Sequence, residues 1–396
     1  MKIIEVNNNK TRRDFLNVAR IIYKKDRNWV CPLDIEIENV FNPSENVFFE
    51  NGEACRWILL DDNNKLIGRV AAFINRNKAF NFQQPTGGMG FFECINDRES
   101  AYMLFDKCKE WLSKRNMEAM DGPINFGEND NWWGLLVDGF TPPGLGMNYN
   151  PPYYKELFES YGFKFYFEQI SNHLNLAKGL PERFRKIAEW VGKKPEYQFE
   201  HFTFKEADRF IKDFMHVYNE AWVFHENFVP IHPENLKKVL QKSKFFIEEK
   251  LIWFAYSNNE PIGFLILFPD ANQILKYFNG KVNLINKIKA VYLKWKKTIN
   301  RGRIVIMGIV PKYQKSGVES GIFYHLEKAI MPLNQYKELE LSWVGDFNPK
   351  MRQLHEAVGG EFAKRHITYR KLFIDNIEFE RSTIIPVDTK EKAVNN

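Results

Sequence analysis

The sequence predicts an α/β fold, a mixed α+β sheet with helices packed on it, built twice in tandem. The chain has 396 residues, which is more than one ordinary hydrophobic core supports. Hydrophobic residues make up 44% of it and aromatic residues 15%, enough to bury two cores. Two landmarks also recur: the turn before Gly68 recurs before Gly263, 195 residues later, and the segment from Asn150 recurs from Asn348, 198 residues later. Both spacings are close to half the chain, so we expect two units with one fold.

Each unit is expected to contain, in order, a strand, two helices, a hairpin, a strand, a helix, a strand, a helix and a strand. In the first unit, apolar periodicity predicts helices at 12–23, about 34–39, 98–114 and 152–161. The hairpin has an apolar strand at 56–60 and a polar turn at Asn63 and Asn64.

The second unit repeats this order. Its expected elements are helices 207–221 and 234–245, a hairpin strand at 252–256, and strands at 304–310, 339–344 and 366–374, the last of which is expected to close the sheet. Glycines and prolines between 180 and 197 interrupt the pattern, so we divide the chain into domains 1–180 and 197–396. Whether the helical stretch 184–191 links the units or belongs to one of them stays open.

The most informative stretch is a strand, a tight loop and a helix between Arg303 and Ile330. Ile304–Val310 is apolar and β-branched, Pro311 ends the strand, and an amphipathic helical pattern begins just after Gly317. A helix that starts in this way leaves backbone N–H groups unpaired at its positive end, which favours an anion such as a phosphate.

The loop Gln314-Lys315-Ser316-Gly317-Val318-Glu319 resembles the Q/R-x-x-G-x-G/A signature of the GNAT acetyltransferase superfamily, in which this turn cradles the pyrophosphate of acetyl-CoA. The segment Asn348–Gly360 is similar to the N-x-x-A-x-x-L-Y-x-x-x-G-F segment that follows in the same superfamily. The resemblance implies two GNAT-like units, the second of which transfers an acyl group, usually acetyl, from acyl-CoA to an amine. It predicts cofactor contacts at Ile309, Val310, Gln314, Lys315, Ser316, Gly317, Val318 and Asn348, and a proton donor for the departing thiolate at His355.

Three departures from the signature leave an alternative open. Glu319 stands where the family has Gly or Ala, His355 where it has Tyr, and Gly360 where it has Phe. In the first unit the corresponding turn, 93–99, has no glycine and three acidic residues, so this unit is not expected to bind CoA. These features also fit a non-catalytic binding or scaffold protein, and a third reading is an acyltransferase with a longer acyl donor at a membrane or carrier surface.

The second unit carries a basic insertion, 271–302, before its central strand. From 271 to 303 there are nine Lys or Arg and no acid, and Ile288, Tyr292, Trp295 and Ile299 recur at helical spacing. A helix of this kind can contact an anionic surface, such as lipid, nucleic acid or an acidic carrier protein. The other interpretation is a surface helix that packs on its own domain with solvated lysines. No specific nucleic-acid partner is predicted.

The remaining candidates concern the acceptor and the compartment. His225 and Glu226 lie in a loop that often shapes the acceptor site in the superfamily, so Glu226 is a candidate base for a small-molecule or peptide amine. The four cysteines are scattered without metal-ligand spacing, and no metal site is expected. No leader pattern and no apolar run of membrane-spanning length were found, which predicts a cytoplasmic protein.

Overall fold

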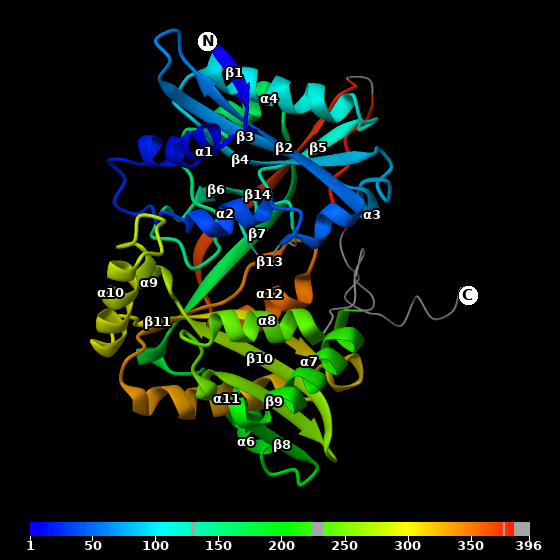
Figure 1. Ribbon diagram of the computed structural model, residues 1–396. Helices are drawn as coiled ribbons and strands as arrows, with labels where there is room; N and C mark the ends of the chain where they lie inside the picture. The colour runs from blue at the N-terminus through cyan, green and yellow to red at the C-terminus, as the bar shows by residue number, and fades with distance from the viewer. Residues whose placement is uncertain (128–130, 223–232, 375–376, 384–396) are drawn as a thin grey trace.

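A computed structural model describes residues 1–127, 131–222, 233–374 and 377–383. One sheet of 14 strands runs through both units, in the order β1-β2-β3-β4-β5-β14-β7-β12-β11-β10-β9-β8, with β6 paired to β14 and β13 to β7. Figure 1 shows the first unit above and the second below, with β7 and β14 crossing between them. The mixed α+β sheet and the tandem arrangement confirm the predicted fold class.

The first unit contains the expected helices and hairpin. Its elements are β1 (Lys2–Glu5), α1 (Asn9–Ile22), α2 (Asp34–Val40), η1 (Val47–Asn51), β2 (Gly52–Leu60), β3 (Leu66–Asn75), α3 (Arg76–Ala79), β4 (Thr86–Cys94), α4 (Arg98–Ser113), β5 (Ala119–Gly122), β6 (Leu135–Asp138), α5 (Tyr154–Tyr161) and β7 (Lys164–Asn175). Helix α1 begins at a capping box, in which Asn8 accepts from the backbone of Thr11 and the Thr11 side chain accepts from the Asn8 backbone.

The second unit follows a short linker. Its elements are η2 (Leu176–Lys178), α6 (Glu182–Val191), β8 (Tyr197–His201), η3 (Phe204–Glu206), α7 (Ala207–Trp222), α8 (Pro233–Ser243), η4 (Glu249–Leu251), β9 (Ile252–Ser257), β10 (Glu260–Pro269), α9 (Asn272–Leu275), α10 (Leu284–Trp295), β11 (Arg301–Ile309), η5 (Pro311–Tyr313), α11 (Val318–Ile330), η6 (Met331–Leu333), β12 (Glu338–Glu340), β13 (Val344–Gly345), α12 (Pro349–Ala357) and β14 (Glu361–Leu372). The β9–β10 turn uses Asn258 and Asn259 with φ of 50° and 67°, a left-handed conformation that Asn tolerates.

The two units exchange their last strands. β14, from the end of the chain, pairs with β5 of the first unit and with β7. β7, from the end of the first unit, pairs with β12 and β13 of the second. The run 366–374 is thus largely a strand, as expected, but it does not close the sheet of its own unit: it joins that of the first. The division into domains 1–180 and 197–396 stays a prediction.

Helices cover both faces of the sheet in each unit. In the second unit, α6, α9, α11 and α12 share a core with one face, which includes Leu265, Ile304, Ile322 and Leu339. Helix α7 packs on the other face through Phe210 and Phe214. None of the described helices is long and apolar enough to cross a membrane.

The linker helix α6 belongs with the second unit. Phe184 packs edge-on against Phe323 of α11, with ring centroids 5.9 Å apart. The Leu180 N–H donates to Glu327 Oε1 at 2.9 Å, and Arg185 forms an ion pair with the same carboxylate at 3.2 Å. These contacts answer the question that the sequence left open.

Candidate functional site

The central feature of the second unit is a wedge between β11 and β12. The two strands pair in parallel only from Arg301–Glu338 to Arg303–Glu340. β11 then continues to Ile309. The segment that follows β12 turns away from β11 and pairs with β7 through β13. Within the described residues, the side of β11 that faces β12 therefore has no strand partner beyond Arg303. Its backbone groups are open to the wedge.

The backbone at the end of β11 divides its hydrogen bonds between two sides. The Val310 N–H donates to the Ile262 carbonyl at 2.9 Å, and the Val310 carbonyl accepts from the Tyr313 N–H at 2.9 Å. Because such bonds alternate along an antiparallel ladder, the N–H of Ile309 points away from β10 and toward the wedge. Ile309 is thus oriented to polarise a carbonyl held there, whereas both backbone groups of Val310 are engaged within the protein.

The loop after β11 opens the positive end of α11. Gly317 is the N-cap residue with φ 87°, and no side chain caps the helix there. A Cβ at Gly317 would lie 2.7 Å from both Ile187 and Val191 of α6, so glycine is required by conformation and by space. Gln314 Nε2 donates to the Ile309 carbonyl at 3.2 Å, and Ser316 Oγ donates to the Tyr313 carbonyl at 2.6 Å. The Gln314 and Ser316 N–H groups donate to the Pro311 and Tyr313 carbonyls, each at 3.3 Å. Within the described residues, the N–H groups of this turn that can still bind an anion are thus those of Gly317 and Val318, at the start of α11.

Glu319 turns toward this loop. Its carboxylate accepts from the backbone N–H groups of Glu319 itself and Lys315. Burial raises the pKa of the carboxyl group, and these two hydrogen bonds oppose the shift. In this conformation the Glu319 carboxylate satisfies part of the anion site, so a phosphate would have to displace it.

The corresponding turn of the first unit is closed. β4 also separates from β5, after Gly88–Asp121, but α4 is capped by Asp97, whose Oδ2 accepts from the Ser100 N–H at 2.8 Å. Glu93 is buried and accepts from the Tyr154 hydroxyl at 2.8 Å. The Asp97 carboxylate therefore occupies the helix N-terminus where a phosphate would bind, and the buried Glu93 adds negative charge in the strand before it.

Helix α12 lies on the other side of the wedge from α11. Asn348 is its N-cap and accepts from the Met351 N–H at 3.3 Å. His355 is 6% exposed, its Nδ1 lies 3.2 Å from Asn172 Nδ2, and burial lowers its pKa to about 4. An imidazole that is neutral at pH 7 is a poor proton donor, which favours packing over acid catalysis for His355. Glu226 lies outside the described residues.

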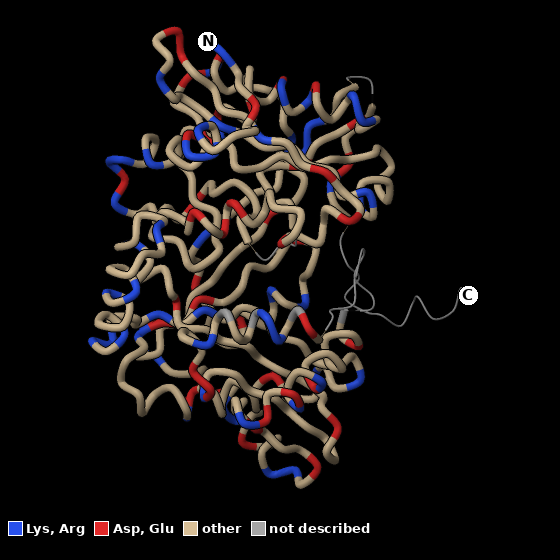
Figure 2. Tube along the Cα trace, viewed as in Figure 1, with Lys and Arg blue, Asp and Glu red and all other residues tan. Residues whose placement is uncertain are grey.

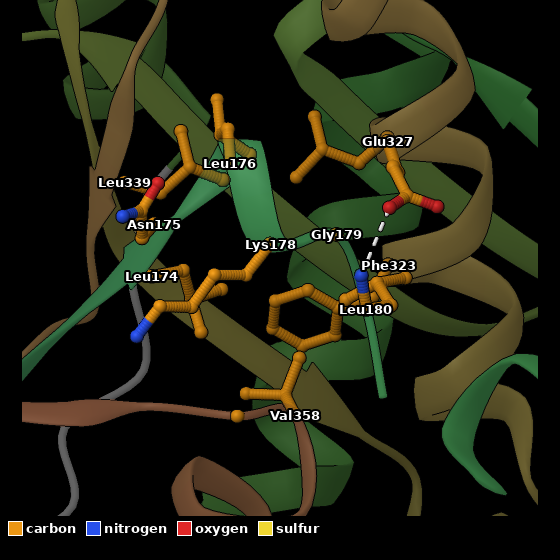
Figure 3. A pocket seen from close by; sticks show the side chains of 12 residues that line it. Leu174, Asn175, Leu176, Lys178, Gly179, Leu180, Phe323, Glu327, Leu339 and Val358 are labelled. Atoms are coloured by element: carbon orange, nitrogen blue, oxygen red, sulfur yellow. Dashed lines mark hydrogen bonds between the residues drawn. The ribbon is translucent and has the colours of Figure 1, made fainter. Parts of the chain in front are cut away.

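An apolar pocket lies farther along α11. Figure 3 shows Leu174, Phe323 and Val358 around it, with the Leu180 N–H donating to Glu327. Its lining comes from the end of β7, the linker, α11, β12 and the end of α12, and includes no residue of the loop 314–318. The pocket thus marks where the linker crosses α11 and is separate from the anion site.

Sequence analysis missed a group of buried polar side chains where the two units meet. We call Trp133, Gln169, Ser171, Glu340 and His366 the seam cluster. Within the described residues, Trp133 Nε1, Gln169 Nε2, Ser171 Oγ, Glu340 Oε1 and His366 Nδ1 are buried without a hydrogen-bond partner. Such atoms are rare in folded proteins and are expected where a ligand supplies the partner.

The members of the seam cluster are linked to one another and to the wedge. Gln169 faces His366 across β7 and β14, and the Trp133 and His366 rings lie 5.9 Å apart. Arg303 lies 5.1 Å from the Trp133 ring centroid and 3.5 Å from Glu340, at the last pair before β11 and β12 separate. Burial raises the pKa of Glu340, opposed by Arg303 and Arg301, and lowers that of nearby Lys364 to about 8. Because these residues come from four distant segments, no sequence motif reveals them.

Two curated proteins are similar over nearly the whole chain. Bacterial ceramide synthase of Caulobacter vibrioides (strain NA1000 / CB15N) is 25% identical over 380 residues, which is 94% of this chain and 97% of that protein. Protein YghO of Escherichia coli (strain K12) is 24% identical over 374 residues, 92% of this chain and 93% of that protein. No family model matches the sequence.

Solved structures identify the fold. A tandem GNAT protein from the clavulanic acid biosynthesis pathway superposes with a TM-score of 0.54 at 10% identity, over 95% of this chain and 99% of that one. The chain therefore has the tandem GNAT fold that the loop and the internal repeat predicted.

Proposed function

We propose that the chain is an acyl-CoA-dependent N-acyltransferase whose acceptor is the amine of a long-chain lipid. The observation that carries acyl transfer is the open, glycine-capped end of α11 directly after the wedge. The lipid acceptor is supported by the similarity to bacterial ceramide synthase over 94% of the chain. A ceramide is the N-acyl derivative of a long-chain amino-diol, so this is the acceptor class proposed. The fold alone does not choose among acceptors.

In the proposed reaction, the pyrophosphate of acyl-CoA displaces Glu319 and binds in the turn Gln314–Val318, at the N–H groups that begin α11, and the thioester lies in the wedge. The Ile309 N–H donates to the thioester carbonyl oxygen, where negative charge develops. The amine nitrogen attacks the carbonyl carbon, the C–S bond breaks, and CoA leaves as the thiolate. The ammonium must first lose a proton, and the second N–H proton leaves as the amide forms.

The seam cluster is proposed to hold the head of the acceptor. An amino-diol carries one amine and two hydroxyls, and the cluster offers both acceptors and donors without partners. Glu340, with its raised pKa and its place at the base of the wedge, is the candidate to take the proton from the ammonium. Arg303 keeps this carboxylate from being an isolated buried charge.

The direct test is amide formation by the full chain. Acetyl-CoA and palmitoyl-CoA are each supplied with sphinganine, and product is followed by mass spectrometry and free thiol release. We expect the N-acylated amino-diol to form together with one free thiol for each amide. CoA binding without amide formation for either donor would favour the alternative of a non-catalytic binding protein, to which the inward-turned Glu319 points.

Ser171→Ala sharpens the acceptor site. Because Ser171 Oγ has no hydrogen-bond partner in the described protein, its removal is expected to leave the free energy of unfolding unchanged. If the hydroxyl binds the acceptor, the KM for sphinganine rises roughly fivefold, about 1 kcal/mol, while the affinity for CoA is unchanged. Ser100→Ala, a buried serine of the first unit, is the matched control and should not affect this KM. An unchanged KM in Ser171→Ala would remove Ser171 from the acceptor site.

A further inference from the structure

Helix α10 exposes its apolar side chains. Leu284, Ile285, Ile288, Val291, Tyr292 and Trp295 are all exposed, with fractions of 73%, 74% and 76% for Leu284, Ile285 and Trp295. Figure 1 shows α9 and α10 at the outer edge of the molecule, beside the level at which the two units meet. Single exposed apolar residues are ordinary, but six on one short helix form a patch that needs a partner.

The inner face of α10 is narrow. Ala290 is buried and Leu293 is partly buried against the core of the second unit. At about 100° per residue, the six exposed apolar residues lie within an arc of roughly 120° opposite Ala290 and Leu293. Sequence analysis allowed that α10 packs its apolar side on its own domain. That interpretation is wrong for most of the stripe, because the stripe faces outward.

Lysines border the exposed stripe on both sides. By the same helical geometry Lys287 and Lys294 lie on one flank, and Lys289 and Lys296 on the other. Lys294 Nζ donates to the Phe245 carbonyl, and Lys289 Nζ lies 5.0 Å from the Tyr277 ring centroid. The sequence from 271 to 303 contains no acidic residue, and Figure 2 shows basic segments in this part of the molecule.

The base of the helix is fixed to the first unit. The Asp34 N–H donates to the Gly280 carbonyl at 2.8 Å, and Arg20 Nη2 donates to the Asn279 carbonyl at 2.9 Å. Arg20 also forms an ion pair with Asp34 at 2.5 Å. The stripe is thus held outward on a rigid base.

We propose that α10 binds in the interfacial region of an anionic lipid bilayer, with the apolar stripe inserted below the headgroups. A wide outward apolar stripe with lysines on both flanks is the pattern of an interfacial helix, and the lysines complement anionic headgroups. An aromatic pair, Tyr292 and Trp295, lies on the stripe, and such side chains favour the membrane–water boundary. This binding surface goes beyond acyl transfer, because vesicle binding can be measured whether or not the chain forms an amide.

The test is flotation of the full chain with vesicles of phosphatidylcholine, with and without 30% phosphatidylglycerol. We expect the chain to float with the anionic vesicles and to bind neutral ones at least tenfold more weakly. Ile288→Ser with Trp295→Ser should lower binding to anionic vesicles at least tenfold. Trp190→Ser, on an exposed Trp of α6, is the matched control and should bind as the parent does.

Charge is tested by Lys287→Glu with Lys296→Glu, against Lys193→Glu with Lys205→Glu, which changes net charge equally at exposed positions elsewhere. Only the first pair is expected to reduce vesicle binding. Equal loss in both pairs, or no binding of the parent to anionic vesicles, would overturn the proposal. Binding of an acidic carrier protein, or dimerisation in solution, that depends on Trp295 while vesicles are ignored would assign the stripe to that partner instead.

Discussion

Helices α4 and α11 occupy equivalent places in the two units, and their first residues differ in one decisive way. The N-terminus of α4 is capped by the Asp97 side chain, whereas the N-cap residue of α11 is Gly317 and has no side chain to cap the helix. Both follow a central strand that separates from its parallel neighbour. A shared fold thus provides two potential anion sites: Asp97 caps the one at α4, whereas the one at α11 has no capping side chain at Gly317 and is occupied in part by the Glu319 carboxylate.

The largest expected effect on CoA affinity comes from placing a side chain at the N-terminus of α11. Gly317→Asp should lower the affinity for CoA at least a hundredfold, to the point where binding is no longer detected. The variant adds a charge where the pyrophosphate binds and a Cβ where α6 leaves no room. The φ of 87° also makes this variant less stable, so its unfolding is measured alongside calorimetry. Lys315→Glu keeps the backbone and should still weaken binding roughly tenfold by charge repulsion. Parent-like affinity in both variants would contradict the site.

A smaller change in CoA affinity is expected when the charge of Glu319 is removed. Glu319→Gln should tighten CoA binding about tenfold, or ~1.4 kcal/mol, by removing a like charge from the loop. Because burial raises the pKa of this carboxyl group, its charge is lost at higher pH than usual as pH falls. The difference in affinity between the parent and the variant should therefore shrink as the solution is acidified. Equal affinities at pH 8 would mean that the carboxylate leaves the loop at no cost.

A substitution at the N-cap of α4 should lower the stability of the protein and leave CoA binding unchanged. Asp97→Ala removes the cap of α4 and should lower the free energy of unfolding by about 1 kcal/mol. Hydrogen bonds to Ser100 lower the pKa of Asp97 in the folded protein. The stability that the cap adds is therefore fully present above the pKa of the unfolded chain, about 4, and is lost as the pH falls through the lower pKa of the folded protein. Denaturant unfolding at pH 7 and pH 3 measures both. A second CoA site in this variant would show that the cap alone had closed the first unit.

The smallest effect is expected at His355. His355→Phe should change turnover less than about threefold, because a buried imidazole with a pKa of about 4 is neutral at pH 7 and lacks the acidic proton of an imidazolium ion. The pH–rate profile should keep its shape. A large loss of turnover with intact CoA affinity would restore the predicted role as the acid.

The sequence was most informative where one short segment determines the local structure. The Asn-rich turns before Gly68 and Gly263 and the segments from Asn150 and Asn348 predicted the repeat, and the glycine loop predicted the anion site, because each pattern is local in the sequence. The structure adds a tertiary reason for the two glycines: a Cβ would lie 2.8 Å from Leu104 at Gly68 and 2.5 Å from Ile309 at Gly263, so packing limits both positions in the same way.

Features that depend on distant segments could not be predicted. The composition of β14 predicts a strand, but not that both of its faces are buried from His366 to Arg370, nor that its partners are β5 and β7. The seam cluster combines residues from β7, β12, β14 and a loop, which only the exchanged strands bring together. For α10, the sequence predicted the apolar stripe and the charge, but not which way the stripe faces.

The number of CoA molecules bound per chain tests the central claim most directly. Isothermal titration of the full chain with acetyl-CoA, and then with palmitoyl-CoA, should give one site per chain, which is lost in Gly317→Asp, weakened roughly tenfold in Lys315→Glu and kept in Asp97→Ala. Two sites per chain, or one site with parent-like affinity in both Lys315→Glu and Gly317→Asp, would contradict the assignment of the cofactor to the N-terminal end of α11.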